Sequence, residues 1–547
     1  MKTNVSLCIA AALMVAACGD PSHRHNSGEK VSVINSEPDE VMEEEVEITS
    51  DEAALMEPSA NATSKMILSS PPPPQQRNAE TYKEIKENSF VAVAQQPVTT
   101  FSADVDRAAY ANVRRIIGYG QIPPKDAVRI EEMVNYFDYD YPTPEEGSAS
   151  PLRVSPELAP APWNPNHLLL RIGLQAKKID LAKAPPSNIV FLIDVSGSMD
   201  EENKLPLLKS SFKMLLGQLR PDDKIAIVTY ANGTKVALPS TSVKDKEKII
   251  KVLDNLYASG GTSGGRGIQL AYEQAQKSFI KNGNNRIILA TDGDFNIGIN
   301  NTTDLEKFIE KQRESGIYMS VLGFGIGNYR DDMAETIADK GNGNYAYIDN
   351  ITEAKKVLVN ELSGTLFAVA KDVKLQLEFN PKYVKEYKLI GYENRMLANE
   401  DFTNDKKDAG EIGAGHTVTA LYELVPSDGK VAQSLRYQSQ ELNEKGKGNE
   451  LGFLKIRYKD PKVKDAKSVE ITEPLVFNKK ALKETSADYR FAASVAEFGI
   501  LLRDNSNKAN ATYDQVIELA EGAIGKDPEG YRKEFVRLVK SVKMLPK

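Results

Sequence analysis

The stretch IVFLIDVSGSMDEENKLPLLKS, residues 189–210, decides the fold. Its first five residues are apolar, a pattern typical of a strand buried on both faces of a parallel sheet. The apolar run ends in Asp194, Ser196 and Ser198, which occupy alternate positions. A carboxylate and two hydroxyls at a buried strand end need polar partners, because burying them unpaired costs free energy. The stretch therefore predicts an α/β sheet with a polar site at the end of one strand.

The surrounding residues 188–370 alternate apolar strands with amphipathic helices. This alternation predicts a Rossmann-like, doubly wound and mainly parallel sheet that is covered on both faces. Ligands of such sheets bind at the carboxyl ends of the strands, where the strand order switches. The expected strands are 188–194, 224–230, 234–238, 286–291, 317–323 and 344–348, and the expected helices lie near 205–219, 244–257, 265–281, 303–314, 330–339 and 352–369.

The polar groups at the strand end form the pattern Asp-x-Ser-x-Ser, which suits a hard cation. Mg²⁺ takes about six oxygen ligands and keeps several waters. Two further oxygen donors occur at equivalent places in the pattern: Thr262 in SGGTSGG, before a helix, and Asp292 in ILATDGD, at a strand end. Taken singly, Ser198 or Asp200 also fits an ordinary cap of the following helix, and the glycines fit an ordinary turn. Their joint occurrence favours a metal site.

The motifs DVSGSM, GGTS and TDGD, in this order, resemble the metal-ion-dependent adhesion site of von Willebrand factor type A domains. The resemblance implies that Ser196 and Ser198 are direct ligands and that Thr262 is a direct or water-bridged ligand. It implies that Asp194 and Asp292 act mainly through water. The implied cation is Mg²⁺, or else Mn²⁺ or Ca²⁺, and the implied partner is a protein that supplies an acidic side chain as the final ligand.

The regions on either side of this block have other patterns. Residues 81–187 mix helical and irregular stretches, with one amphipathic helix expected at 128–137 and a tyrosine cluster expected in a core. After residue 370 the apolar period becomes two, which predicts half-buried antiparallel strands at 373–379, 418–424 and 453–458. Helices close the chain, so the C-terminal region is expected to be an α+β domain. The tyrosines are Tyr136, Tyr139 and Tyr141, and the closing helices are one with Phe491, Val495, Phe498 and Leu502 on one face and another near 531–544.

Segments of both regions resemble bacterial YfbK-like lipoproteins, which carry a family-specific segment on each side of a type A domain. The segments are TFSADVDRAAYANVRR before the block, and LIGYENRMLANEDF and YRFAASVAEFGILLRD after it. Arg107 and Ala108 depart from the more usual form DVDTASY, but they lie outside the metal motifs. The resemblance runs from about residue 85 to the C-terminus. It implies an N-terminal family-specific domain at 81–187, the type A domain at 188–370 and a C-terminal family-specific domain at 371–547.

The first residues predict export with a lipid anchor. Residues 1–17 have the charged start, short apolar middle and small residues of a signal peptide. Cys18 follows VAA, as in the lipobox of bacterial lipoproteins, and would become the lipidated N-terminus. Residues 18–80 form an acidic and proline-rich tether that is expected to be disordered. We therefore expect a protein anchored in the bacterial envelope, and Gly19 favours the outer membrane over the inner one.

Composition narrows the classes of function. The chain has 547 residues, 41% hydrophobic and 27% charged, which fits about three or four globular domains. Its net charge of −8 comes from the tether, because residues 36–57 hold ten acidic residues and no basic ones. The rest is nearly neutral without long basic runs, so nothing favours nucleic acid. Cys8 and Cys18 are the only cysteines, and removal of the signal leaves no internal disulfide.

Three functions fit these observations, and the first is favoured. The site holds a protein partner through a divalent cation; or it is a metal-assisted hydrolase; or it only stabilises the fold. Hydrolysis normally uses a positioned base, most often histidine. The four histidines are His23 and His25 in the tether, His167 before the sheet and His416 in the C-terminal region. Ser196 does not lie in a G-x-S-x-G elbow, because Asp194 and Val195 precede it, and no Walker P-loop occurs, so we expect no enzyme.

Overall fold

The computed structural model describes residues 80–104, 106–262, 264–293, 302–327, 329–428, 448–463, 466–504 and 508–546. The predicted signal peptide, Cys18 and nearly all of the tether lie outside the described residues. So does Asp294, the second aspartate of the TDGD motif.

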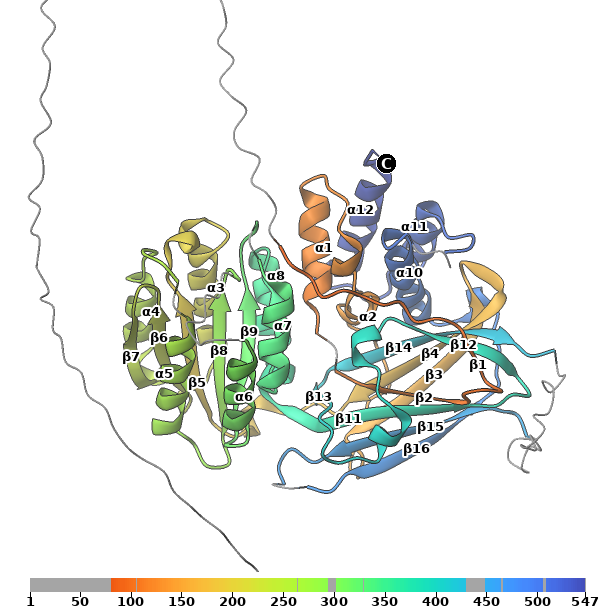
Figure 1. Ribbon diagram of the computed structural model, residues 1–547, viewed down its shortest axis with the longest axis horizontal. Helices are drawn as coiled ribbons and strands as arrows, with labels where there is room; N and C mark the ends of the chain where they lie inside the picture. Colours follow the sequence, from red (N-terminus) through yellow and green to blue (C-terminus); the bar gives the residue numbers. More distant parts are fainter. Residues whose placement is uncertain are drawn as a thin grey trace, which may run out of the picture. The chain divides into compact units, whose positions relative to one another are not determined.

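The predicted α/β domain is present, and it forms the left part of Figure 1. Its sheet has the order β10-β9-β8-β5-β6-β7, in which β7 alone pairs antiparallel and the other described strands pair parallel. The mainly parallel, doubly wound sheet is therefore confirmed. Its strands are β5 (Ser187–Asp194), β6 (Lys224–Tyr230), β7 (Thr234–Ser242), β8 (Asn284–Thr291), β9 (Ile317–Gly323) and β10 (Tyr345–Tyr347).

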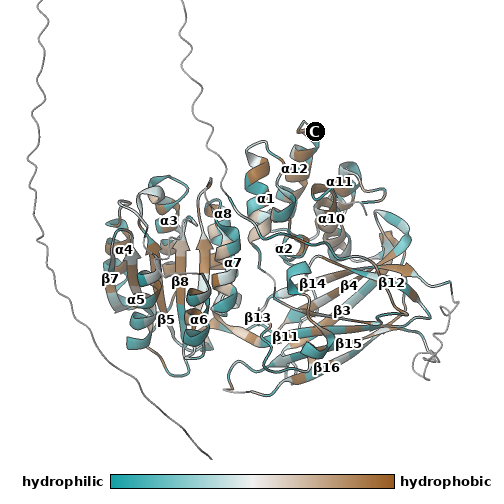
Figure 2. Cartoon of the chain, viewed as in Figure 1, coloured by the Kyte–Doolittle hydropathy of each residue, from teal (hydrophilic) through white to brown (hydrophobic). Residues whose placement is uncertain are grey.

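Helices cover both faces of this sheet. Alternate residues of β5 enter different cores: Phe191 packs with α3, α4 and α8, and Leu192 packs with α5, α6 and α7. Figure 2 shows the result, with hydrophobic strands inside and hydrophilic surfaces on the outer helices. A strand buried on both faces explains the unbroken apolar run of β5. The helices are α3 (Leu205–Gln218), α4 (Lys246–Asp254), α5 (Gly264–Lys277), α6 (Thr302–Arg313), α7 (Asp331–Lys340), α8 (Ile351–Lys355), a π-helical turn (Lys356–Asn360) and α9 (Leu362–Leu366).

The flanking regions build antiparallel sheets. One has the order β1-β12-β14-β4-β3, and the other has the order β13-β11-β15-β16 with β2 paired to β11. Side chains of both sheets share one hydrophobic core, so the sheets pack face to face. The strands are β1 (Val91–Ala92), β2 (Val98–Ser102), β3 (Leu152–Ala161), β4 (Asn164–Ala176), β11 (Ala368–Phe379), β12 (Val384–Ile390), β13 (Gly410–Gly413), β14 (Thr417–Pro426), β15 (Glu450–Lys459) and β16 (Val469–Val476).

The long strands β3 and β4 correct the expectation of only helical and irregular structure in residues 81–187. β3 contains Pro156 and Pro160, which interrupt the strand pattern and are tolerated because β3 lies at the sheet edge. β4 contacts different cores on its two faces: Leu168 and Leu170 point into the core between the sheets, whereas Leu169 packs against helices. Burial on both faces removes the apolar–polar alternation by which a strand is recognised.

Strands from the two ends of the chain share these sheets. β4, from before the α/β domain, lies between β3 and β14, and β2 pairs with β11 over residues 98–102. The family resemblance implies separate domains at 81–187 and 371–547. In the structure their hydrogen-bonded ladders join them across the inserted α/β domain, which leaves and re-enters the same β structure (Figure 1).

A helical layer covers the outer face of the first antiparallel sheet. The core of this layer contains the predicted face of the closing helix, including Phe491 and Phe498, and the three tyrosines expected in a core, all of them buried. The helix expected at 128–137 is shorter than predicted. Within the described part of the chain, none of the helices has the length and apolar character needed to cross a bilayer. The helices of the layer are α1 (Ala108–Gly118), α2 (Ile130–Asn135), α10 (Ala487–Leu502), α11 (Tyr513–Glu521) and α12 (Tyr531–Met544).

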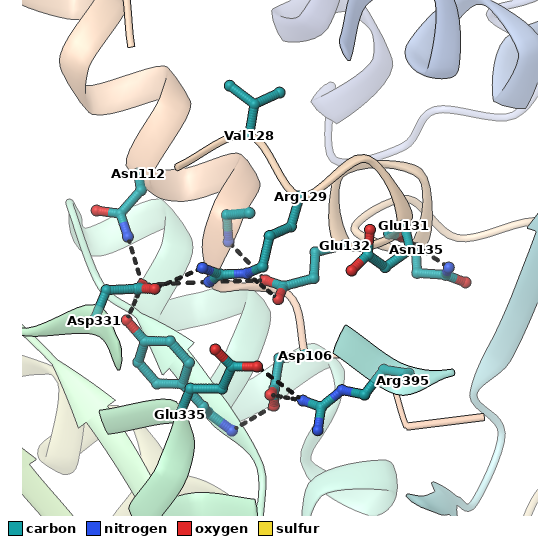
Figure 3. A network of polar contacts seen from close by, with 12 residues as sticks. Asp106, Asn112, Val128, Arg129, Glu131, Glu132, Asn135, Asp331, Glu335 and Arg395 are labelled. Atoms are coloured by element: carbon teal, nitrogen blue, oxygen red, sulfur yellow. Dashed lines mark hydrogen bonds and ion pairs between the residues drawn. The ribbon is translucent and has the colours of Figure 1, made fainter. Parts of the chain in front are cut away.

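Buried ion pairs fasten the α/β domain to the flanking structure (Figure 3). Arg129, which precedes α2 and is 2% exposed, donates from Nη1 to Asp331 Oδ2 at 2.6 Å. Asp331 is the first residue of α7 and is fully buried. Arg129 also pairs with Glu132 of α2. Its guanidinium thus lies between a carboxylate of the α/β domain and one of the helical layer.

A second arginine completes this network from the C-terminal region. Arg395 Nη2 lies 3.1 Å from Asp106 Oδ2 and 3.2 Å from Glu335 Oε1 on α7. Asp106, Glu132 and Glu335 are buried, and one ligand oxygen from each lies within 4.8 Å of the others. Burial raises the pKa of Asp106 and of Glu132. Here the two guanidinium groups supply the opposing charge (Figure 3).

Arg129→Met should lower the free energy of unfolding by about 3–5 kcal/mol, because it leaves Asp331 and Glu132 buried without their common partner. Chemical unfolding followed by circular dichroism measures the loss. The control is Lys540→Met on α12, whose pair with Glu521 is half exposed on both sides and should cost less than about 1 kcal/mol. Equal losses in the two variants would contradict the fastening role of Arg129.

Candidate metal centre

The predicted site lies where the strand order switches. From β5 the chain moves to β6 and β7 on one side, and then to β8, β9 and β10 on the other. β5 pairs in parallel with β6 and with β8, up to Ile193 opposite Ala290. The carboxyl ends of β5 and β8 are therefore adjacent, which is where ligands of doubly wound sheets bind. Asp194 ends β5, and Asp292 follows directly after β8.

A tight turn after β5 brings the two serine hydroxyls together. Ser196 donates its backbone N–H to Asp194 Oδ1 at 2.9 Å, and the Oγ atoms of Ser196 and Ser198 lie 3.1 Å apart. A 3-10 turn at Gly197–Asp200 produces this approach. Asp194 is fully buried, Ser196 is 1% exposed and Ser198 is partly exposed. The turn therefore presents converging hydroxyl oxygens in front of a buried carboxylate.

The loop that carries Thr262 is hydrogen-bonded to this turn. Gly197 N donates to Gly260 O at 2.8 Å, and Ser259 N donates to Val195 O at 2.8 Å. Gly260 has φ of +79°, a conformation that favours glycine, and its backbone passes against the Asn232 side chain. Thr262 follows two residues later, half-buried and just before α5. The glycines of SGGTSGG thus hold the threonine loop beside Ser196 and Ser198.

Asp292 joins the site through a lysine. Asp292 is fully buried, and Lys204 Nζ lies 3.3 Å from its Oδ2 atom. The same ammonium donates to the carbonyl oxygen of Ser198 at 2.9 Å. Lys204 therefore connects the end of β8 to the turn after β5.

Electrostatics at the site favour a cation. Burial raises the pKa of Asp194 to about 6, partly opposed by hydrogen bonds from Ser196, and the charge of Asp292 raises it further. Asp194 Oδ2 also accepts from Thr291 Oγ1 at 3.4 Å. Two buried carboxylates at adjacent strand ends concentrate negative charge in a region of low dielectric.

The donor set fits a hard divalent ion. Every predicted ligand offers oxygen, which is the ligand atom that Mg²⁺, Mn²⁺ and Ca²⁺ prefer. Ser196 and Ser198 are close enough to bind one ion together, and Asp194 and Asp292 are fully buried at the adjacent ends of β5 and β8. The structure thus positions all five predicted residues, Asp194, Ser196, Ser198, Thr262 and Asp292, on segments that meet at one edge of the sheet. Their role as ligands stays a prediction.

Sequence reasoning missed two residues of this edge, Lys204 and Thr291. Thr291 is the last residue of β8 and reads as an ordinary strand residue. Lys204 precedes α3 and reads as a solvated charge, because lysine is rarely buried. No local pattern marks either residue, and only the packing of β8 and α3 against β5 reveals them.

The described histidines lie outside the α/β domain. His167 belongs to β4, and its Nδ1 atom lies 2.6 Å from Glu423 Oε1 on β14. His416 precedes β14 and lines a cavity with Arg107 and Glu361. Neither the contact of His167 nor the cavity lining of His416 includes a residue of the predicted metal site. Burial lowers the pKa of His416 to about 4, and the charge of Arg107 acts in the same direction.

Comparison with known proteins supports the type A domain and the flanking family-specific regions. The family model described as von Willebrand factor type A domain matches residues 188–360, and the one described as von Willebrand factor matches residues 76–171. The model described as uncharacterized protein YfbK, C-terminal, matches residues 364–545. The uncharacterized protein YfbK of Escherichia coli strain K12 is 48% identical over 465 residues, which cover 84% of this chain and 80% of that protein. The chain belongs to the YfbK family.

More distant relatives share a smaller part of this YfbK-family chain. The uncharacterized protein sll0103 of Synechocystis is 30% identical over 34% of this chain and 43% of that protein. Mouse inter alpha-trypsin inhibitor, heavy chain 4, is 27% identical over 25% of this chain and 16% of that protein. Among solved structures, von Willebrand factor type A from Catenulispora acidiphila covers 84% of this chain and 91% of that chain at 14% identity, with a TM-score of 0.39.

The depressed pKa of His416 predicts a pH dependence of stability. Unfolded histidine has a pKa near 6.5, so below about pH 6.5 the unfolded chain binds a proton that folded His416 takes up only near pH 4. His416 should therefore make the folded state lose about 2 kcal/mol between pH 7.5 and pH 5. Urea unfolding of wild type and His416→Gln measures this loss. If the variant follows the wild type with a constant offset, the prediction is wrong.

Proposed function

We propose that this protein is a lipoprotein of the bacterial cell envelope that uses a divalent cation to hold a protein partner. The cation binds Ser196, Ser198 and Thr262 directly or through water, and Asp194 and Asp292 support it from the interior. The observation that carries the proposal is the 3.1 Å approach of two serine hydroxyls at the switch point, where the adjacent strand ends hold two fully buried carboxylates. An acidic side chain of the partner supplies the last ligand.

The distribution of charge supports binding of an acidic partner. Hydroxyl ligands carry no charge, so a divalent ion held mainly by Ser196, Ser198 and Thr262 keeps much of its own charge. Asp194 and Asp292 have no exposed surface. Exposed ligand positions of the ion therefore face outward, where a carboxylate is a favourable oxygen ligand. The metal supplies a strong local positive charge at the surface when it is bound.

The surface beside the site offers room for the residues around the partner's acidic side chain. A cavity of about 330 Å³ is lined by Val195 and Ser259, which border the serine turn, and by Asn232, Lys235 and Tyr257. Tyr257 is 74% exposed. Exposed tyrosine is common in protein interfaces, because it has a large apolar ring and a polar end. We place the partner's neighbouring residues in this cavity.

The membrane part of the proposal rests on the sequence. Cys18 would carry the lipid chains, and residues 18–80 would form the tether between the membrane and the folded structure. A multiply acylated cysteine gives stable anchoring, since each buried methylene contributes about 0.8 kcal/mol. We propose the outer membrane, following Gly19.

Binding is preferred to hydrolysis and to a purely structural role. The α/β domain contains no histidine, and His167 and His416 are engaged in the flanking structure. A metal that only stabilises the fold would not need partly exposed donors, yet Ser198 and Thr262 reach the surface. The arrangement thus suits capture of a ligand more than chemistry on it.

Ser198→Ala should weaken Mn²⁺ binding to the purified full chain by at least about tenfold, because it removes one oxygen ligand. Titration followed by electron paramagnetic resonance of free Mn²⁺ measures the affinity. The matched control is Ser210→Ala on α3, whose hydroxyl donates to Pro206 O on the exposed side of the helix. Circular dichroism of both variants should match the wild type. Equal Mn²⁺ affinity in wild type and Ser198→Ala would contradict the metal site.

Affinity capture from detergent-solubilised envelope tests the partner. The bait is the full chain in Mg²⁺, the full chain in chelator, or Asp292→Ala in Mg²⁺. Proteins retained only by wild type in Mg²⁺ are expected. An identical catch under all three conditions would move the binding function to the flanking structure.

A further inference from the structure

A buried lysine, Lys204, lies at the edge of the sheet that carries the five predicted metal-site residues. Lys204 is 2% exposed, and its ammonium lies 3.3 Å from Asp292 Oδ2 and 2.9 Å from the Ser198 carbonyl oxygen. It also contacts Glu201 Oε1 at 3.2 Å, but Glu201 is 54% exposed and its charge is screened by water. The strong interactions of Lys204 are therefore those with the predicted site.

Packing fixes the position of this ammonium. The aliphatic part of Lys204 runs across Gly325, where any side chain would collide with the Cδ, Cε and Cγ atoms of the lysine. Gly325 has φ of +80°, which also favours glycine, and Tyr347 Oη donates to its carbonyl. The backbone of Lys204 lies at the start of α3. A side chain held at both its stem and its charged end has little freedom to leave the site.

The lysine changes the charge count of the site. Asp194 and Asp292 together contribute −2, and Lys204 brings this sum to −1. A divalent cation then makes it +1, and one partner carboxylate brings it to zero. Without the lysine, the same site with its cation would be neutral before any partner arrived. A fixed positive charge beside the cation repels the cation and attracts the partner's carboxylate.

We propose that Lys204 is a specificity-determining residue, which weakens metal binding and in exchange makes the metal-loaded site selective for an anionic ligand. This inference rests on the proposed function. It explains why the metal-loaded site would bind a carboxylate in preference to a neutral oxygen ligand such as water or an amide. Low-dielectric surroundings strengthen the effect, since Asp292 and Lys204 are both buried.

Lys204→Met tests the inference through two affinities that should change in opposite directions. Mn²⁺ should bind about tenfold more tightly to the variant than to wild type, because a repelling charge is gone. Acetate should bind the Mn²⁺-loaded variant several-fold more weakly than the loaded wild type, because an attracting charge is gone. Paramagnetic resonance of free Mn²⁺ gives the first affinity, and water-proton relaxation during acetate titration gives the second. All measurements use the full chain.

Two further variants separate charge from structure. Lys204→Gln is neutral but can still donate to the Ser198 carbonyl, so it should behave as Lys204→Met and serves if the methionine variant does not fold. Lys213→Met, on the same helix, removes a partly exposed lysine that pairs with Asp254, and both affinities should stay at the wild-type values. If Lys204 only held the turn in place, both neutral variants would bind Mn²⁺ more weakly than the wild type.

The outcomes are distinct. Tighter Mn²⁺ and weaker acetate binding in both neutral variants support the inference. Unchanged or weaker Mn²⁺ binding in them, with normal binding in wild type, overturns the inference and leaves the proposed function intact. No Mn²⁺ binding in wild type overturns the proposed function and this inference with it.

Discussion

Two carboxylates, Asp194 and Asp292, have no exposed surface at the carboxyl end of the parallel sheet, and the surrounding structure compensates for the cost of burying them. The backbone of Ser196 and the hydroxyl of Thr291 donate to Asp194, and the ammonium of Lys204 lies beside Asp292. The parallel pairing of β5 with β8 makes the two strand ends adjacent. The constraint explains why hydroxyls, a threonine loop and a buried lysine gather at one edge.

Buried charges that need partners also determine the junction between the α/β domain and the flanking structure. Asp331 and Glu335 of α7 face Arg129 from one flanking region and Arg395 from the other. Buried ion pairs of this kind cost much when one partner is lost, so they favour one arrangement of the parts. The shared β sheets add a second constraint, because β4 precedes the inserted domain and is hydrogen-bonded to β14, which follows it. The predicted metal site belongs to the inserted domain, and Gly293, next to Asp292, lies against the backbone of Arg330, which directly precedes Asp331 of the junction.

The fold of the α/β domain followed closely from local pattern. Unbroken apolar runs, such as residues 189–193, mark strands buried on both faces, and each of the expected strands is present within a few residues. β4 is also buried on both faces, so it lacks the alternation of a half-buried strand, and without regularly alternating helices around it the apolar run did not indicate a parallel sheet either. The edge strand β3 was missed because its prolines interrupt the strand pattern.

By itself, the sequence determined the doubly wound sheet, the family and the oxygen-rich residues at the strand ends. These features depend on the burial pattern and turn residues of short segments, which are visible in neighbouring residues. Tertiary structure alone decided the rest. The pairing of β4 with β14 and of β2 with β11 joins segments more than two hundred residues apart, and no local period encodes such a partner. The place of Lys204 was equally hidden, since its charge reads as solvated until α3 and Gly325 enclose it beside Asp292.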